Sequence, residues 1–215
     1  MKKIFISVLA LMTSVVLAAC SAGATSETTP VESYLPEGAE FIRSEKDDGF
    51  TEQKYRDASG EYTLLIDKSD AVRALEYDAA ARSTAESIVL SAEEAFAKLV
   101  AIYPEAELIA AVEDRDDGRY EWGILFKTAS DLAFYELDAA TGDILDYDVF
   151  FGLADTVNLN EILTANMANA SVIEISLDAD DGRLWLEGEA RTDNGPMEFK
   201  IDADSGILIE AEYDD

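Results

Sequence analysis

Residues 135–142 read YELDAATG, and residues 199–206 read FKIDADSG, 64 positions later. In each stretch an aspartate follows an aromatic residue by three positions, and a glycine follows that aspartate by four. The sequence DDGR has the same offset, because it occurs at 116–119 and again at 180–183. Two separate motifs that recur at the same offset, so that the two copies align without an insertion or deletion between the motifs, indicate an internal repeat.

The aspartate and the glycine of each motif are expected to build a turn. An aspartate side chain accepts hydrogen bonds from the amides of a turn, and glycine readily adopts the positive φ that such turns need. We therefore predict a structural role for four turn residues, Asp138, Gly142, Asp202 and Gly206. Direct contact of Asp138 or Asp202 with a partner is the alternative.

A helix is predicted before each repeat. Ser91 and Glu94 form the sequence of a capping box, and Asn158 and Glu161 form an equivalent one. Apolar residues then recur at the helical spacing of 3.6, which gives each helix one buried stripe. These residues are Ala92, Ala95, Phe96, Leu99, Val100 and Tyr103 in the first helix, and Leu159, Ile162, Leu163 and Met167 in the second.

Strands are predicted after each helix. Apolar and polar residues alternate within 120–127 and within 184–189, as in a sheet with one buried face. Asp-Gly pairs and Asn194-Gly195 are typical of hairpin turns. The expected fold class is therefore α+β, built from tandem repeats of one helix packed on an antiparallel β-sheet.

The chain divides into five parts by composition and pattern. We expect a signal peptide at 1–19, a lipidated cysteine with a flexible tether at 20–38, a partial repeat made mainly of strands at 39–89, and two full units at 90–150 and 157–215. Residues 79–90 leave two alternatives open, because their alanines favour a helix whereas their position also suits a linker.

The first twenty residues have the order of a secretion signal. Lys2 and Lys3 precede an apolar run over 4–17, which is shorter than the roughly 20 residues of a membrane-spanning helix. Residues 17–20 read LAAC and resemble the lipobox of bacterial lipoproteins, in which the cysteine receives a diacylglyceryl group. The resemblance implies that Cys20 is lipidated and anchors the protein on the extracytoplasmic side of a bacterial membrane. An ordinary secreted protein with a chance cysteine is the alternative.

The chain is strongly acidic. It has 46 Asp and Glu against 16 Lys and Arg, which gives a formal charge of −30. Such a surface repels nucleic acid, so we expect no nucleic-acid partner. Hydrophobic residues make up 48% of the chain, which is enough for a folded core. A single cysteine excludes an internal disulfide, so that core must stabilise the fold.

Most catalytic chemistry is absent from the composition. The chain has no histidine, which removes Ser-His-Asp and Cys-His catalysis and the commonest zinc ligand. No glycine-rich phosphate loop occurs. The acidic turns at 178–182 and 202–206 lack the ligand spacing of an EF-hand, which leaves only weak calcium binding open. We therefore expect no catalytic residues, no cofactor and no specific metal site, with a carboxylate-only hydrolase as a remote alternative.

The capped helix, the strand that leads into the Asp-x-x-Thr-Gly turn and the Ile-Leu strand that follows resemble the PepSY domain. The residues that carry this resemblance are Tyr135, Asp138, Thr141, Gly142, Ile144 and Leu145, with Phe199, Asp202, Ser205, Gly206, Leu208 and Ile209 in the second unit. PepSY units occur in extracytoplasmic bacterial proteins and in propeptides of metallopeptidases, where they bind or restrain peptidases. The unit is also similar to β-lactamase inhibitor protein-like domains and to a small outer-membrane assembly lipoprotein.

The resemblance implies a non-enzymatic extracytoplasmic lipoprotein that acts as a protein-binding module and modulates a peptidase. The alternative is a structural or assembly lipoprotein of the cell envelope. We expect two kinds of partner, the membrane through lipid on Cys20 and a peptidase or envelope protein. Trp185 alternates with Leu184 and Leu186, so it lies on the opposite sheet face and is the candidate binding residue. Cover by the other repeat is the alternative for Trp185.

Overall fold

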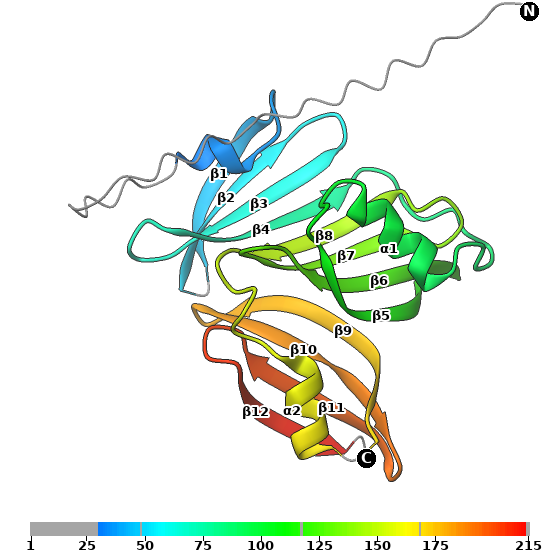
Figure 1. Cartoon of the computed structure of the whole chain (residues 1–215). Coiled ribbons are helices and arrows are strands. Elements are labelled where there is room, and N and C mark those ends of the chain that lie inside the picture. The colour runs from blue at the N-terminus through cyan, green and yellow to red at the C-terminus, as the bar shows by residue number, and fades with distance from the viewer. Residues whose placement is uncertain (1–29, 48, 117, 168, 214–215) are drawn as a thin grey trace, which may run out of the picture.

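The computed structural model describes residues 30–47, 49–116, 118–167 and 169–213 (Figure 1). The expected signal peptide, Cys20 and the first part of the expected tether lie outside these residues. Among the helices of the described ranges, none has the length and hydrophobicity to cross a membrane.

The elements follow one another in a simple order. A 3-10 helix, η1 (Val31–Tyr34), precedes β1 (Glu40–Asp47), β2 (Phe50–Arg56), β3 (Gly60–Ile66) and β4 (Val72–Ala79). Helix α1 (Ala92–Val100) is followed by β5 (Glu107–Asp116), β6 (Arg119–Lys127), β7 (Leu132–Asp138) and β8 (Ile144–Phe150). Helix α2 (Leu159–Asn166) is followed by β9 (Ser171–Asp180), β10 (Arg183–Thr192), β11 (Gly195–Asp202) and β12 (Ile207–Tyr213).

The strands form two antiparallel sheets. The larger sheet has eight strands in the order β1-β2-β3-β4-β8-β7-β6-β5, and the smaller has four in the order β12-β11-β10-β9. The two sheets lie one above the other in Figure 1, with α1 against the larger and α2 against the smaller. Strand β5, at the edge of the larger sheet, lies beside β9 of the smaller one.

The predicted α+β fold class, with tandem repeats of one helix on an antiparallel sheet, is wrong. Most described residues belong to strands, and the two α-helices have only nine and eight residues. Strand β4 pairs with β8 through Leu75 opposite Val149 and Tyr77 opposite Tyr147. This pairing merges the strands that follow α1 with the N-terminal strands, so the first expected unit has no sheet of its own.

Local signals for the helices are confirmed. The Ser91 Oγ accepts a hydrogen bond from the Glu94 amide at 3.3 Å, and the Glu94 carboxylate accepts one from the Ser91 amide at 2.8 Å. At α2, the Asn158 side chain accepts a hydrogen bond from the Glu161 amide at 3.3 Å. Residues 80–90 contain no helix, so the linker alternative describes them correctly.

One face of the larger sheet carries a row of tyrosines. Tyr55, Tyr62, Tyr77, Tyr147 and Tyr135 are consecutive cross-strand partners on β2, β3, β4, β8 and β7. Ring centroids are 4.8 Å apart for Tyr62 and Tyr77, and 4.7 Å apart for Tyr147 and Tyr135. Such pairs stabilise a sheet beyond the burial of their area. Helix α1 covers one end of this face through Ala95 and Leu99, and residues 31–35 of the expected tether pack at the other end.

The opposite face of the larger sheet packs against the smaller sheet and α2. Phe134 and Phe150 share one apolar cluster with Leu163 of α2 and with Leu186 of β10. An ion pair between Arg73 and Asp204 also joins the two sheets. The β1–β2 turn approaches the β9–β10 turn so closely that a Cβ on Gly49 would lie 2.6 Å from the Gly182 Cα. The two sheets therefore share one hydrophobic core.

Candidate functional site

Residues 80–90, named the strap here, cross the ends of β6 and β7 before α1 begins. The backbone of the strap binds the backbone beside these strands. The Ala85 carbonyl accepts a hydrogen bond from the Tyr120 amide at 3.0 Å, and the Ala139 carbonyl accepts bonds from Val89 and Leu90 at 3.1 and 2.9 Å. The Trp122 indole donates to the Leu90 carbonyl at 3.0 Å.

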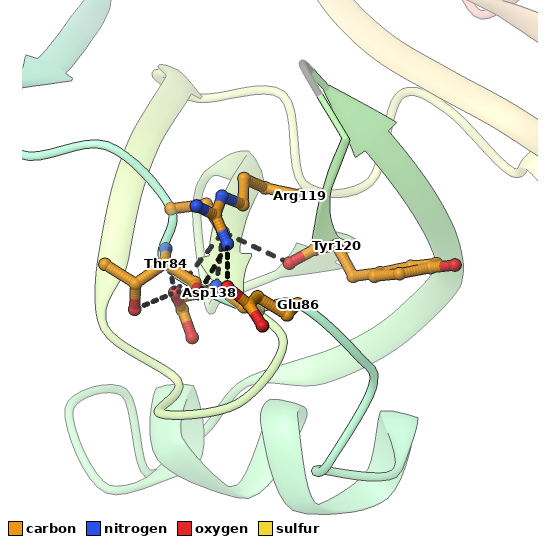
Figure 2. Close-up of polar contacts among 7 residues, drawn as sticks. Thr84, Glu86, Arg119, Tyr120 and Asp138 are labelled. Atoms are coloured by element: carbon orange, nitrogen blue, oxygen red, sulfur yellow. Dashed lines mark hydrogen bonds and ion pairs between the residues drawn. The ribbon is translucent and has the colours of Figure 1, made fainter.

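Asp138 lies at the centre of this arrangement, at the end of β7, with 2% of its surface exposed (Figure 2). Its Oδ2 accepts hydrogen bonds from the Thr84 and Ala85 amides at 2.7 and 3.1 Å. The hydroxyls of Thr84 and Ser83 lie 3.2 and 3.3 Å from the same oxygen. Its Oδ1 accepts bonds from two turn amides, those of Ala140 and Thr141, both at 2.9 Å.

These contacts decide the charge of Asp138. Burial raises its pKa, but hydrogen bonds from the amides of Thr84, Thr141 and Ala140 lower it, and the net result is a pKa far below the usual range. The carboxylate is therefore ionised at neutral pH. Because a carboxylate has about four lone-pair positions, these donors occupy both oxygens and leave no room for substrate or metal. The geometry fits a structural clamp that holds the strap.

Arg119 contributes a weaker contact on the outer side of the strap (Figure 2). Its Nη1 lies 3.2 Å from the Glu86 carboxylate and 3.4 Å from the Thr84 carbonyl oxygen, to which it donates. The Glu86 side chain is 85% exposed, so solvent screens this ion pair. The buried aspartate, and not this surface pair, holds the strap in place.

The second turn has the same backbone geometry. The Gly206 amide donates to the Asp202 carbonyl at 2.8 Å, as the Gly142 amide does to the Asp138 carbonyl. Both glycines have a positive φ, 66° and 73°. The Asp202 Oδ1 accepts bonds from the amide and the hydroxyl of Ser205, both at 2.9 Å. Among the described contacts of Asp202, none comes from a strap, and the Arg183 guanidinium lies 3.8 Å from Oδ2.

Trp185, the residue proposed from the sequence for partner binding, is only 7% exposed. Lys200 Nζ lies 4.5 Å from the ring centroid, and the Arg183 Cζ lies 5.7 Å from it. The indole nitrogen donates to the Asp180 carbonyl at 3.4 Å. These contacts come from its own sheet, not from the other repeat. In this structure Trp185 therefore presents little aromatic surface to a partner.

The sequence patterns missed a group of carboxylates on β5, β6 and β7. Each of Asp114, Glu121 and Glu136 contributes one carboxylate oxygen, and these three oxygens all lie within 4.8 Å of one another. Asp78, Asp146 and the basic Arg82 line the same pocket, whose volume is about 190 Å³. Oxygen ligands of this kind suit a hard divalent cation. The three residues lie on three different strands, so they meet only through the pairing of those strands and match no ligand-spacing motif.

Acidic residues also face each other directly on the sheet face that is turned toward the smaller sheet. Glu76 of β4 is the cross-strand partner of Asp148, and Asp78 is the partner of Asp146. Burial, together with Glu52, raises the pKa of Glu76 to about 7. Burial and the nearby Asp78 raise the pKa of Asp146 to about 7, and burial beside Asp146 raises that of Asp148 well above its usual value.

Residues 82–148 match the family described as peptidase propeptide and YPEB domain, PepSY. The resemblance to PepSY is thereby confirmed for the segment that runs from the strap into β8. Residues 157–215 lie outside this match.

Two solved structures are similar to the chain. One is a candidate lipoprotein from Clostridium difficile 630, with 18% identity, a TM-score of 0.31, and coverage of 59% of this chain and 94% of that chain. The other is the C-terminal domain of YpeB from Bacillus megaterium, with 13% identity, a TM-score of 0.33, and coverage of 83% of this chain and 91% of that chain. No curated protein matches the sequence.

Proposed function

We propose that this chain is a non-enzymatic extracytoplasmic lipoprotein that binds a protein partner, and that the partner is a peptidase. The observation that carries the proposal is the PepSY match of 82–148, whose description links the family to peptidase propeptides. The clamp at Asp138 supports the non-enzymatic part, because the most buried carboxylate of the matched segment is fully occupied by structural donors.

The composition also supports a binding role. The chain has no histidine, and its single cysteine is the proposed lipid site. Catalysis that uses a histidine base or a cysteine nucleophile is therefore outside the reach of the folded part. The pocket of Asp114, Glu121 and Glu136 is the place to test the carboxylate-only alternative, with a glycan as the substrate class.

Lipid on Cys20 would hold the folded part close to the membrane. Pro30, the first described residue, lies ten positions after Cys20. An extended chain spans at most about 3.5 Å per residue, so the lipid can lie no more than roughly 35 Å from Pro30. The partner is therefore expected among proteins at or near the same membrane surface.

The test is chemical cross-linking in intact cells that express the full chain, followed by identification of the cross-linked proteins. The expected result is a peptidase cross-linked to the parent, whose activity changes when purified chain is added. A Cys20→Ser variant is the matched control, because it keeps the folded part and removes the proposed anchor. Envelope defects on deletion, without any cross-linked peptidase, would contradict the proposal and favour a structural lipoprotein.

A further inference from the structure

Two strands of the structure have an open edge. The larger sheet ends at β1 and the smaller at β12, whereas the remaining sheet edges, β5 and β9, lie beside each other. Figure 1 shows β12 at the margin of the smaller sheet. In the part of the chain that the structure describes, no strand pairs with the outer edge of β12.

Strand β12 exposes apolar side chains along this edge. Ile207 is 58% exposed, Ile209 is 54% exposed and Tyr213 is 48% exposed. Only Leu208 among its seven residues is partly buried. Exposed edges with apolar residues invite pairing with another strand, since the backbone groups of the edge have no partner within the sheet.

The charges near this edge select the partner. Glu174, Glu189, Glu198 and Glu212 are consecutive cross-strand partners on β9, β10, β11 and β12. Glu210 lies two residues before Glu212 on the exposed strand. A second copy of this chain would set glutamates against glutamates, whereas lysine or arginine on an added strand would extend the row with opposite charge.

We propose that the outer edge of β12 binds an extended strand of a partner protein in which apolar residues alternate with lysine or arginine. The inference rests on the proposed protein-binding function and names the surface for it. The partner strand adds to the smaller sheet by backbone hydrogen bonds. Its apolar side chains lie beside Leu208 and Tyr213, on the face that is turned toward the core. Its cations meet Glu210 and Glu212 on the opposite face, which Ile207 shares.

Strand β1 supplies a matched control. Ile42 in β1 and Ile209 in β12 each lie at a register shift, where each is the one residue without a cross-strand partner. Ile42 is 45% exposed and Ile209 is 54% exposed. Mixed charges surround Ile42, because Arg43, Glu45 and Lys46 lie on the same strand. Both isoleucines are exposed enough that a lysine in their place should leave the fold intact.

The probe is a short acetylated peptide in which valine and lysine alternate, and its binding to the full chain is measured by calorimetry. We expect Ile209→Lys to weaken binding about tenfold, and Ile42→Lys to leave it within about twofold of the parent. A second peptide of equal charge carries N-methyl groups on the residues that would pair with β12. It should bind about tenfold more weakly than the first, because it cannot form the edge hydrogen bonds.

Equal losses in the two lysine variants, or equal binding of the N-methylated peptide, would show attraction by charge alone and overturn the inference. The result is separable from the test of the proposed function. A cross-linked peptidase that binds the parent and Ile209→Lys equally would overturn the edge inference and leave the proposed function standing.

Discussion

The rings of Tyr77 and Tyr147 stack with centroids 4.8 Å apart and an angle of 24° between their planes. They are direct cross-strand partners at the junction of β4 and β8, where the N-terminal strands meet the strands that follow α1. This contact continues the row of tyrosines across the only pairing that joins these two groups of described strands. The junction is therefore held by aromatic packing as well as by backbone hydrogen bonds.

Replacement of Tyr147 by alanine should destabilise the whole chain. Loss of a large aromatic side chain from a packed row is expected to lower the free energy of unfolding by about 3 kcal/mol. Urea denaturation measures this change. Tyr213→Ala, at a side chain that is 48% exposed, is the control and should change stability by only about 0.5 kcal/mol. Similar losses in both variants would contradict the role of the row.

Replacement of Asp138 by asparagine should release the strap. The amide group of asparagine would face the donors of Thr84 and Ala85, so charge-assisted bonds are lost and unfolding becomes about 2 to 3 kcal/mol easier. Hydrogen exchange should accelerate at these two amides. Asp202→Asn is the control, because its side chain holds the Ser205 turn and a long ion pair with Arg183 but no strap amide in the described contacts, and its cost should be about 1 kcal/mol.

Stability should rise as the pH falls from about 7 toward about 4. Glu76 and Asp146 have a pKa of about 7 in the folded chain, above the unfolded value near 4, so the folded state binds more protons across this window. The pH dependence has the opposite sign for Asp138, because its pKa is lowered in the folded chain. Its contribution to the free energy of unfolding is lost only below about pH 4.

Glu76→Gln should restore part of the stability that the folded chain loses at high pH, where the buried Glu76 carboxylate is ionised. We expect this variant to be more stable than the parent by about 2 kcal/mol at pH 8, and to lose that advantage near pH 4. Thermal denaturation across this pH range provides the measurement. Glu105→Gln, at an exposed position before β5, is the control. A parallel pH profile for parent and Glu76→Gln would show that Glu76 does not titrate in this window.

Replacement of Cys20 by serine should abolish lipid attachment. The chain is then expected in the soluble fraction or as an unprocessed precursor, because a serine hydroxyl does not take the lipid. Fractionation of cells and the mass of the N-terminal peptide would report both outcomes. Membrane association equal to that of the parent would contradict lipidation of Cys20, and an unmodified cysteine in the parent would do so directly.

Short-range features were predictable from the sequence. The capping box at Ser91 agrees with the sequence pattern, because a cap depends on residues only three positions apart. At Asn158 only half of the predicted box forms among the described contacts, since the Glu161 carboxylate accepts from the Asn158 side chain and not from its backbone amide. The turns after β7 and β11 follow the same logic, since aspartate and glycine satisfy local backbone needs. The similarity of 82–148 to PepSY was likewise visible in residues close together in sequence.

Long-range features were not predictable in this way. The pairing of Tyr77 with Tyr147 joins strands 70 residues apart, and alternation within a strand does not name its neighbour. The contact between Thr84 and Asp138 spans 54 residues, so the strap looked like either a helix or a linker. The carboxylates of Asp114, Glu121 and Glu136 meet only because three strands are adjacent.

Because β8 lies between β4 and β7 in the larger sheet, an incomplete chain lacks the strand that pairs with β4. Strands β1 to β4 are made first, yet the outer edge of β4 finds its partner only when residues 144–150 have been made. Until then a four-stranded meander carries an open edge with apolar residues such as Leu75 and Ala74. Unpaired edges of this kind are prone to aggregate in incomplete chains. A chain that ends between β4 and β8 would therefore expose this edge, which favours aggregation.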